Sequence, residues 1–316
     1  MNTLLTGAVD IGGTKIQAGI VDNTGSIIIS QSFPTAANTQ SAAQAMDKIA
    51  EMLKVQCATR NIRMASLRGI GISCSGPVDY EQGIIENPYT LPGWDGFPAA
   101  AYLLEKTGLQ VRMDNDANGA LLGEILLRDL YDERVLMITI GTGIGVAFWY
   151  EKHLYRCGRY HPEMGHIIVA SRDRKCYCGH AGCFESCCSG KAMNERAEES
   201  GFHDFDDLYR QAQKGDVRGQ ETVRSIMQDM SNGIWSLNII FKPNIIIFAG
   251  GFSVKYFSFI KDIVLKDSLG KSDFLNDFTI LPAGENRNPA LAGANMMFCD
   301  AGRQIPDPAS VHTVLP

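Results

Sequence analysis

The chain has 316 residues, of which 45% are hydrophobic and 20% charged, and its formal net charge is −6. A chain of this length is too long to form a single small core, so we expect two lobes. Its net negative charge argues against a nucleic-acid partner, which would need a basic surface. The first residues lack the basic region of a signal peptide, and no apolar run approaches the roughly 18 residues of a membrane helix, so we expect a cytoplasmic protein without membrane contact.

Short strand-like segments dominate the first third of the chain. The strands are expected at 4–11, 15–22, 27–33, 67–73 and 109–115. The first three are joined by turns rich in Gly, Asn and Thr, which predicts an antiparallel meander. Residues 39–56 carry apolar side chains at helical spacing. Strands that alternate with helices predict an α/β fold.

The second half begins with a similar pattern. Residues 134–140 and 144–150 are expected to be strands around the turn "GTG", and "EKH" leads into a third strand. This repeats the pattern of the N-terminal strands and suggests two related lobes. Helices are expected after about residue 189, the longest at 216–241, followed by a strand "NIIIF" and a last helix at 289–300. The tail from residue 302 is expected to be loosely ordered.

Two glycine-rich turns are candidates for phosphate binding. "DIGGTK" supplies Asp10, Gly12, Gly13, Thr14 and Lys15, and "TIGTGIG" supplies Gly141, Thr142 and Gly143. Glycine lets the backbone approach a ligand, and successive N–H groups form an anion site. Neither turn is a Walker A loop, and the alternative is a pair of ordinary glycine hairpins. If the phosphate role holds, Gly143→Val should raise the KM for ATP far more than that for the second substrate.

Asp116 is expected at a junction between a strand and a helix, in "MDNDANGALLGE". One interpretation is an N-cap residue, which stabilises a helix by about 1 kcal/mol. The other is a functional carboxylate at the carboxyl end of a strand, where open α/β sheets bind ligands. In phosphoryl transfer such a group could accept the proton of a substrate hydroxyl.

Three loops that follow strands are weaker candidates. The loop at 71–79 includes Gly76, and the loop at 87–94 includes Asn87 and Thr90; both suit contacts with a sugar. "FAGG" ends in Gly250 and Gly251 between a strand and a helix, a place suited to the ribose and base of a nucleotide.

A cluster of cysteines and histidines predicts a metal site. The nine cysteines are odd in number and lack the spacing of a disulfide framework, which fits a reducing compartment. Cys176, Cys178 and Cys183 form C-x-C-x4-C, and His166 lies ten residues upstream. Three thiolates and one imidazole suit a closed, structural zinc site. The paired CxxC and HxxxH spacing of DNA-binding zinc fingers is absent, and the alternative is a group of unrelated buried thiols.

Together these motifs resemble the ROK family of bacterial sugar kinases and sugar-responsive repressors, in the actin-like hexokinase superfamily. The resemblance extends from "DIGGTK" to "NPALAGANMMF", and its most specific part is "EMGH" followed by CxCGxxGCxE. It implies an α/β, two-lobed actin-like ATPase (ribonuclease H-like) fold with a ligand cleft between the lobes. We expect a small lobe of residues 1–114 joined by 299–316, and a large lobe of 115–298 that carries the zinc-binding loop.

The resemblance also implies roles for individual residues. Asp116 matches the catalytic base, the two glycine turns match the phosphate motifs, and "AGG" matches the adenosine motif. Positions that contact the sugar match Asn115, Glu163, His166 and Glu185, and the zinc ligands match His166, Cys176, Cys178 and Cys183. His166 would then bind zinc through one nitrogen and face a sugar hydroxyl with the other side of its ring. The implied cofactors are ATP, Mg²⁺ and a structural Zn²⁺.

The implied reaction is transfer of the ATP γ-phosphoryl group to a hexose, at the 6-hydroxyl, by a homodimer. Thr90 stands where family glucokinases often have asparagine, and "HPEMGH" is similar to fructokinase-like members. The acceptor is therefore expected to be glucose or a close relative, with fructose and N-acetylmannosamine as rivals. One alternative is a sugar-sensing regulator; because nine residues precede Asp10, we expect no DNA-binding domain. The other is a zinc-dependent binding module without catalysis.

Overall fold

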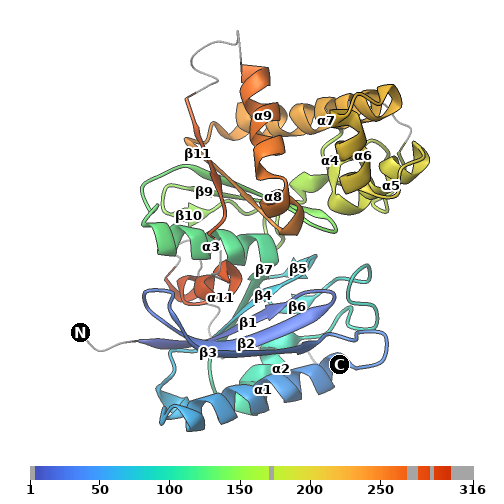
Figure 1. Ribbon diagram of the computed structural model, residues 1–316. Coiled ribbons are helices and arrows are strands. Elements are labelled where there is room, and N and C mark those ends of the chain that lie inside the picture. The colour runs from blue at the N-terminus through green and yellow to red at the C-terminus, as the bar shows by residue number, and fades with distance from the viewer. Residues whose placement is uncertain (1–3, 171–173, 269–276, 285–287, 300–316) are drawn as a thin grey trace. The chain divides into compact units, whose positions relative to one another are not determined.

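The computed structural model describes residues 4–170, 174–268, 277–284 and 288–299. The chain divides into two compact units (Figure 1). The first consists of Met1–Asp132, Trp149–Pro162 and Gly284–Pro316, and the second of Glu133–Phe148 and Glu163–Ala283. The lobe boundary predicted from the sequence, between residues 114 and 115, lies inside the first unit, where the helix that begins at Asp116 packs. Among the described residues, no helix is both long and apolar enough to cross a membrane.

A five-stranded mixed sheet forms the centre of the first unit, with the strand order β3-β2-β1-β4-β7. Its strands are β1 (Leu5–Ile11), β2 (Lys15–Asp22), β3 (Ile27–Pro34), β4 (Ile70–Cys74) and β7 (Val111–Asn115). The first three strands pair antiparallel, as the predicted meander requires, and β4 and β7 continue the sheet in parallel. A separate two-stranded ribbon is formed by β5 (Val78–Asp79) and β6 (Ile84–Ile85).

Helices cover both faces of this sheet (Figure 1). They are α1 (Ala42–Thr59), α2 (Ala99–Thr107), α3 (Asp116–Arg128) and α11 (Pro289–Gly293), with 3-10 turns η1 (Met64–Ser66) and η3 (Met296–Phe298). The α1 helix starts with a capping box between Ser41 and Gln44, and its apolar stripe packs on one face of the sheet. On the other face, α3 and α11 approach closely because Gly123 has no Cβ, which would collide with the carbonyl of Pro289.

The register of the parallel strands brings candidate residues to one edge of the sheet. Ile11 of β1 pairs with Cys74 of β4, and Cys74 pairs with Asn115 of β7. The segments that follow these three residues are the first glycine turn, the loop with Gly76, and the start of α3. Open α/β sheets bind ligands at this carboxyl edge.

The second sheet repeats the architecture of the first, with the strand order β10-β9-β8-β11-β12. Its strands are β8 (Val135–Ile140), β9 (Ile144–Tyr150), β10 (His153–Leu154), β11 (Ile245–Ala249) and β12 (Thr279–Pro282). As in the first sheet, three consecutive strands are followed by two more, with β8, β11 and β12 parallel. The repeat inferred from the sequence is therefore present in the strand order.

Helices account for most of the remaining second unit. They are η2 (Met164–His166), α4 (Phe184–Cys188), α5 (Gly190–Glu199), α6 (Phe205–Gln213), α7 (Val217–Phe241), α8 (Gly251–Lys255) and α9 (Phe257–Ser268). Their apolar side chains share one core with β8, β9 and β11. Cys187 and Cys188 are fully buried in this core, so they serve packing.

The C-terminal helix differs from the sequence prediction. Instead of one helix over 289–300, α11 ends at Gly293 and a 3-10 turn follows at Met296–Phe298. The chain tightens there because the Ala294 N–H bonds the carbonyl of Leu291. The predicted loose tail from residue 302 lies outside the described residues.

Candidate functional site

Asp116 is the first residue of α3, directly after the carboxyl end of β7. It is not the N-cap: that position belongs to Asn115, whose Oδ1 accepts the Ala117 N–H at 2.9 Å. Asp116 Oδ1 accepts the same N–H at 2.8 Å, which leaves its second oxygen for another partner. The capping interpretation therefore fits Asn115, and Asp116 needs a different explanation.

The electrostatic setting of Asp116 suits a proton acceptor. Burial, together with the negative charge of Asp10, raises the pKa of Asp116 from 3.8 to about 7, against the opposing hydrogen bond from Ala117. Burial also raises the pKa of Asp10, opposed by Asn288 and Lys15. A carboxylate with a pKa near neutrality combines a useful ionised fraction with basicity, as a general base requires.

A buried ion pair fixes the β7–α3 junction. Asp114 Oδ1 accepts the Asn115 N–H at 2.9 Å and the Asn118 amide at 2.8 Å, while Oδ2 pairs with Arg156 at 2.8 Å. Both charged side chains are almost fully buried. Removing one partner of such a pair leaves an uncompensated charge, so Arg156 holds the strand end that carries Asp116. Sequence reasoning missed Arg156, because an arginine in a loop outside any motif carries no signal.

The first glycine turn lies beside the loop of residues 87–90. Gly13 has no Cβ, and one placed there would lie 3.3 Å from Cβ and from the carbonyl oxygen of Thr90. Thr90 Oγ1 lies 3.3 Å from Ser75 Oγ, next to Gly76. Gly13, Thr14, Lys15 and Thr90 are exposed, so this group of residues is open to a ligand.

Asn87 has a structural role in this loop. Its side chain is fully buried. Its Oδ1 accepts the N–H groups of Tyr89 and Thr90, and its Nδ2 donates to the Ser75 carbonyl and to Thr90 Oγ1. An asparagine amide has two donors and two main acceptor positions, and all four are used inside the protein. Asn87 therefore shapes the loop, and Thr90 is the residue of the pair that faces outward.

The second unit brings the second glycine turn close to the "AGG" segment. Gly250 has φ = +87°, and a Cβ there would collide with the backbone of Ile140, directly before the turn. The Gly190 N–H donates to the Gly141 carbonyl at 2.8 Å, so the start of α5 also contacts the turn. Gly141 and Gly251 have open space where a Cβ would stand.

Gly143 has a second reason to be glycine. A Cβ at this position would collide with the carboxylate of Glu185. Glu185 Oε2 accepts the Ile144 N–H at 2.7 Å, so the glutamate of the cysteine motif binds the backbone of the candidate phosphate turn. The expectation that Gly143→Val would raise the KM for ATP far more than that for the second substrate is therefore revised, since valine would also displace Glu185.

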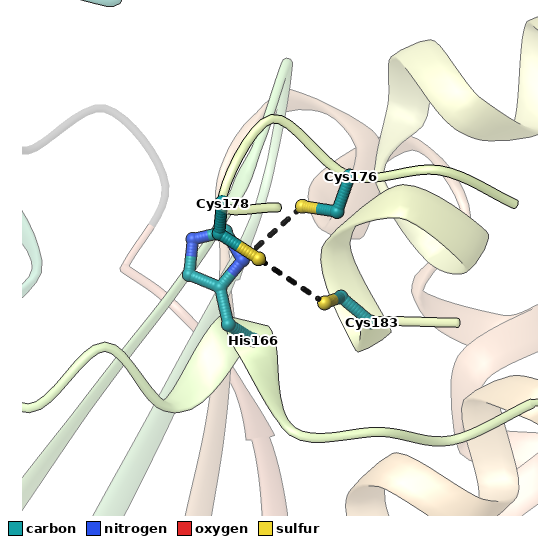
Figure 2. Close-up of side chains that lie close together, drawn as sticks. All are labelled: His166, Cys176, Cys178 and Cys183. Carbon is teal, nitrogen blue, oxygen red and sulfur yellow. Dashed lines mark hydrogen bonds between the residues drawn. The ribbon is translucent and has the colours of Figure 1, made fainter. Parts of the chain in front are cut away.

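The four predicted zinc ligands come together (Figure 2). The candidate ligand atoms of His166, Cys176, Cys178 and Cys183 all lie within 4.8 Å of one another. His166 Nδ1 is 3.4 Å from Cys176 Sγ, and Cys178 Sγ is 3.6 Å from Cys183 Sγ. A tetrahedral zinc with bonds of about 2.0–2.3 Å has ligand–ligand edges of about 3.4–3.8 Å, so the donor set and its spacing fit Zn²⁺.

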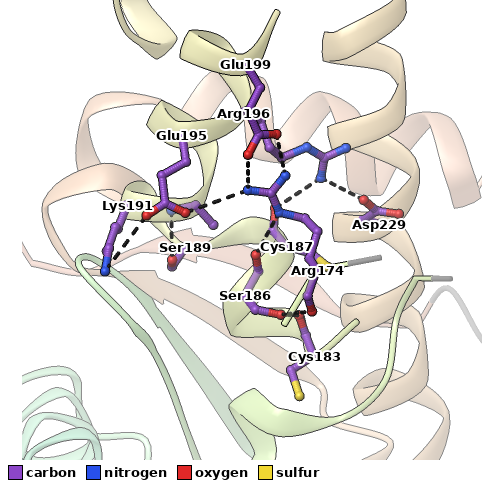
Figure 3. Close-up of polar contacts among 11 residues, drawn as sticks. Arg174, Cys183, Ser186, Cys187, Ser189, Lys191, Glu195, Arg196, Glu199 and Asp229 are labelled. Carbon is purple, nitrogen blue, oxygen red and sulfur yellow. Dashed lines mark hydrogen bonds and ion pairs between the residues drawn. The ribbon is translucent and has the colours of Figure 1, made fainter. Parts of the chain in front are cut away.

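An arginine anchors the loop that carries the cysteines (Figure 3). Arg174 pairs with both carboxylate oxygens of Glu199 on α5, at 2.7 and 3.3 Å, and its Nε donates to the Ser186 carbonyl at 3.2 Å. Its own carbonyl accepts the Gly182 N–H at 2.8 Å. The loop is thus tied to α4 and α5 next to Cys183 and Glu185.

The outer nitrogen of His166, which the family resemblance assigns to a sugar hydroxyl, has a partner within the protein. Nε2 lies 3.1 Å from the hydroxyl of Tyr177, the residue between the first two cysteines. Burial, and after it the negative charge of the nearby Glu185, raises the pKa of the Tyr177 phenol. Glu163 is exposed and directly precedes η2, the turn that contains His166. Sequence reasoning missed Tyr177 because the motif leaves its position unspecified.

The predicted residues thus form two groups, one in each unit. The first unit gathers Asp10, Gly12, Gly13, Thr14, Lys15, Gly76, Asn87, Thr90, Asn115 and Asp116. The second gathers Gly141, Thr142, Gly143, Glu163, His166, Cys176, Cys178, Cys183, Glu185, Gly250 and Gly251. A basic carboxylate, exposed glycine turns and a metal-type cluster beside polar side chains suit phosphoryl transfer to a polyhydroxyl acceptor.

Comparison with known proteins identifies relatives over most of the chain. The model of the ROK family matches residues 6–300. A glucokinase of Halalkalibacterium halodurans is 29% identical over 266 residues, covering 78% of this chain and 79% of that protein. Other relatives are named N-acetylmannosamine kinase, in Salmonella typhi at 28% identity, and xylose repressor, in Bacillus subtilis at 23%.

Solved structures show the same fold. A ROK hexokinase of Thermus thermophilus superposes with a TM-score of 0.79 at 25% identity, covering 93% of this chain and 97% of that one. A ROK family glucokinase of Streptomyces griseus, in complex with glucose and AMPPNP, gives a TM-score of 0.71 at 26% identity over 93% and 98% of the two chains. The α/β fold with two mixed five-stranded sheets is therefore the actin-like fold of the ROK hexokinases.

Proposed function

The chain belongs to the ROK family, and on that premise we propose that it is an ATP-dependent hexose kinase with Asp116 as its general base. The observation that carries this proposal is the pKa of Asp116, raised to about 7 on a carboxylate with one oxygen left outside its backbone hydrogen bond. An aspartate with only a structural role at the start of a helix would be expected to have a lowered pKa, because a helix N-terminus stabilises negative charge.

In the proposed reaction, a hydroxyl oxygen of the sugar, that of the 6-hydroxyl, attacks the γ-phosphorus of ATP. The bond between that oxygen and phosphorus forms as the bond between phosphorus and the β,γ-bridging oxygen breaks, and ADP leaves. Asp116 accepts the hydroxyl proton. Asn115 precedes it and contacts the sugar, and the Asp114–Arg156 pair holds the strand end in position. Positioning and charge stabilisation provide most of the catalysis in such transfers.

The glycine turns take the nucleotide in this proposal. Backbone N–H groups of Gly13, Thr14, Thr142 and Gly143 bind phosphate oxygens, while the Gly12 and Gly141 N–H groups close the turns by bonding the carbonyls of Lys15 and Gly143. Gly250 and Gly251 leave room for the adenosine. Magnesium would neutralise the phosphates of ATP; the Asp10 carboxylate offers the oxygen ligand that this ion prefers. The open space around Gly141 and Gly251 supports this assignment, since a ligand can approach the backbone there.

The sugar is bound by Glu163, His166 and Glu185, together with Thr90. Thr90 replaces Asn87 in this role, because Asn87 has no hydrogen-bonding group left for a ligand. Glucose or a close relative is the proposed acceptor, with fructose and N-acetylmannosamine as the rivals. The names of the relatives, which include glucokinase and N-acetylmannosamine kinase, agree with this range.

Zinc has a structural role in the proposal. Four protein ligands close the coordination shell and leave no position for water or substrate. Cys183 is followed closely by Glu185, and His166 belongs to the "EMGH" turn, so the metal holds two sugar contacts in place. None of the nine cysteines belongs to a disulfide, which suits a reducing compartment, and we place the enzyme in the cytoplasm.

The alternative is a sugar sensor without catalysis, which the repressors among the relatives favour. A coupled ADP-release assay with glucose, fructose, mannose and N-acetylmannosamine separates the two. The kinase proposal predicts sugar-dependent ADP release with one of these acceptors. Binding of a sugar without ADP release, by folded protein that contains zinc, would establish the sensor instead.

A further inference from the structure

Tyr177 occupies polar atoms that the proposed function assigns to the sugar. Its hydroxyl lies 3.1 Å from His166 Nε2, and Glu185 is close enough for its charge to act on the phenol. The rings of Tyr177 and His166 meet edge to face, with their centroids 5.1 Å apart. Tyr177 is 57% exposed, so its side chain can move without opening the core. The phenol therefore occupies the outer nitrogen of His166, one of the three proposed sugar contacts in the second unit, and lies near a second one, Glu185.

The cysteine cluster determines the direction of the hydrogen bond between His166 and Tyr177. His166 Nδ1 faces the cysteine sulfurs, 3.4 Å from Cys176 Sγ, and is the nitrogen that would bind zinc. A neutral imidazole that gives its Nδ1 lone pair to a metal carries its hydrogen on Nε2. Nε2 therefore donates to the Tyr177 oxygen. Glu185 also accepts the Ile144 N–H, at 2.7 Å, which holds its carboxylate in place.

A sugar hydroxyl has the same hydrogen-bonding groups as the Tyr177 hydroxyl, namely one donor and two lone pairs. It could accept from His166 Nε2 in the same way and donate to the nearby carboxylate of Glu185. We propose that Tyr177 is an affinity- and specificity-determining residue, whose hydroxyl takes the place of one sugar hydroxyl between His166 and Glu185 and is displaced when the sugar binds. This inference rests on the assignment of His166 and Glu185 to the sugar.

Displacement has two measurable consequences. The apparent affinity for the sugar is reduced by the fraction of molecules in which Tyr177 occupies the position. The selectivity changes too, because only a sugar that carries the competing hydroxyl has to displace the phenol. A deoxy sugar that lacks this hydroxyl binds with Tyr177 still in place and gains nothing from its removal.

The test compares Tyr177→Phe with the wild type and with Tyr102→Phe as a control. Tyr102 loses a comparable hydrogen bond, 3.0 Å to Asp47, on the surface of the first unit. Calorimetric titration should show the accepted hexose binding about tenfold more tightly to Tyr177→Phe, the effect of one to two hydrogen bonds. Tyr102→Phe should bind as the wild type does. Among monodeoxy analogues of that hexose, one should bind equally to wild type and Tyr177→Phe.

Two outcomes of the titration would overturn the inference. Weaker binding by Tyr177→Phe would mean that the hydroxyl bonds the sugar directly, and equal binding would mean that it lies away from the sugar. If Tyr177→Phe loses zinc or fails to fold, the Tyr177 ring resonances of the wild type decide: a sugar-dependent shift supports displacement, and no shift contradicts it. Sugar binding without phosphoryl transfer would overturn the kinase proposal but not this inference. Sugar binding by neither protein would overturn both.

Discussion

Replacing Asp116 with asparagine should remove catalysis and stabilise the protein at the same time. The pKa of Asp116 rises from 3.8 to about 7 on folding, mainly through burial and then through the charge of Asp10. Keeping this group ionised in the folded protein therefore costs free energy. A difference of about 3 pKa units, at 1.36 kcal/mol each, sets an upper limit of about 4 kcal/mol. Because part of the Asp116 side chain still contacts solvent, we expect a gain of about 1–3 kcal/mol for the variant.

The gain in stability of Asp116→Asn over the wild type should depend on pH. Between pH 4 and 7 the folded state retains a proton that the unfolded state has lost, so the wild type loses stability as pH rises. The asparagine side chain cannot ionise, so the stability of Asp116→Asn over wild type should be near zero at pH 4 and reach its full value above pH 7. Urea unfolding of the nucleotide-free proteins at pH 4, 6 and 8 measures it. Asp95→Asn, at an exposed position, is the control.

The activity of the same variant tests the assignment of the base. The kcat of Asp116→Asn should fall about 10²–10⁴-fold, as is typical when a general base is lost. In the wild type, kcat/KM should fall tenfold per pH unit below about 7, where Asp116 becomes protonated. A variant that is not stabilised at pH 8 would refute the reasoning about the buried charge. A variant with more than half of the wild-type kcat would refute the base.

Two further predictions concern the second unit. Gly141→Ala should raise the KM for ATP with little change in the KM for the sugar, because its Cβ meets no protein atom and would only obstruct the nucleotide. Gly143→Ala should raise both KM values, because its Cβ collides with Glu185. Equal effects of the two changes would contradict this distinction. Cys178→Ser should lower the zinc content below one per chain and weaken sugar binding far more than ATP binding at temperatures where the variant stays folded. Lost thermal stability with unchanged sugar affinity would make the cluster only a distant stabilising element.

The elements with strong local patterns could be predicted from the sequence. The meander, the helix α1 and the repeat in the second half all follow from alternating or helical spacing of apolar residues. The zinc cluster could also be predicted, because its spacing alone allows four ligands to meet. The strand β12 was missed: it has four residues, all at least partly exposed, and its place is set by pairing with β11.

Contacts between distant segments could not be predicted. Asn87 looked like a sugar contact, but its burial depends on Ser75 and Thr90, which no local pattern joins to it. Gly143 looked like a glycine required by phosphate alone, and its contact with Glu185, more than 40 residues away, became visible only in the fold. In both cases the sequence identified the residue, but its role depends on a contact with a distant residue that only the fold shows.

The most direct test of the central claim is to identify the product of the reaction. Wild-type protein with bound zinc is incubated with MgATP and each hexose, and sugar phosphate and ADP are quantified by mass spectrometry. The account predicts one sugar monophosphate for each ADP from the accepted hexose, and loss of both products with Asp116→Asn. Release of ADP without sugar phosphate, or no reaction by a protein that binds the sugar, would contradict it.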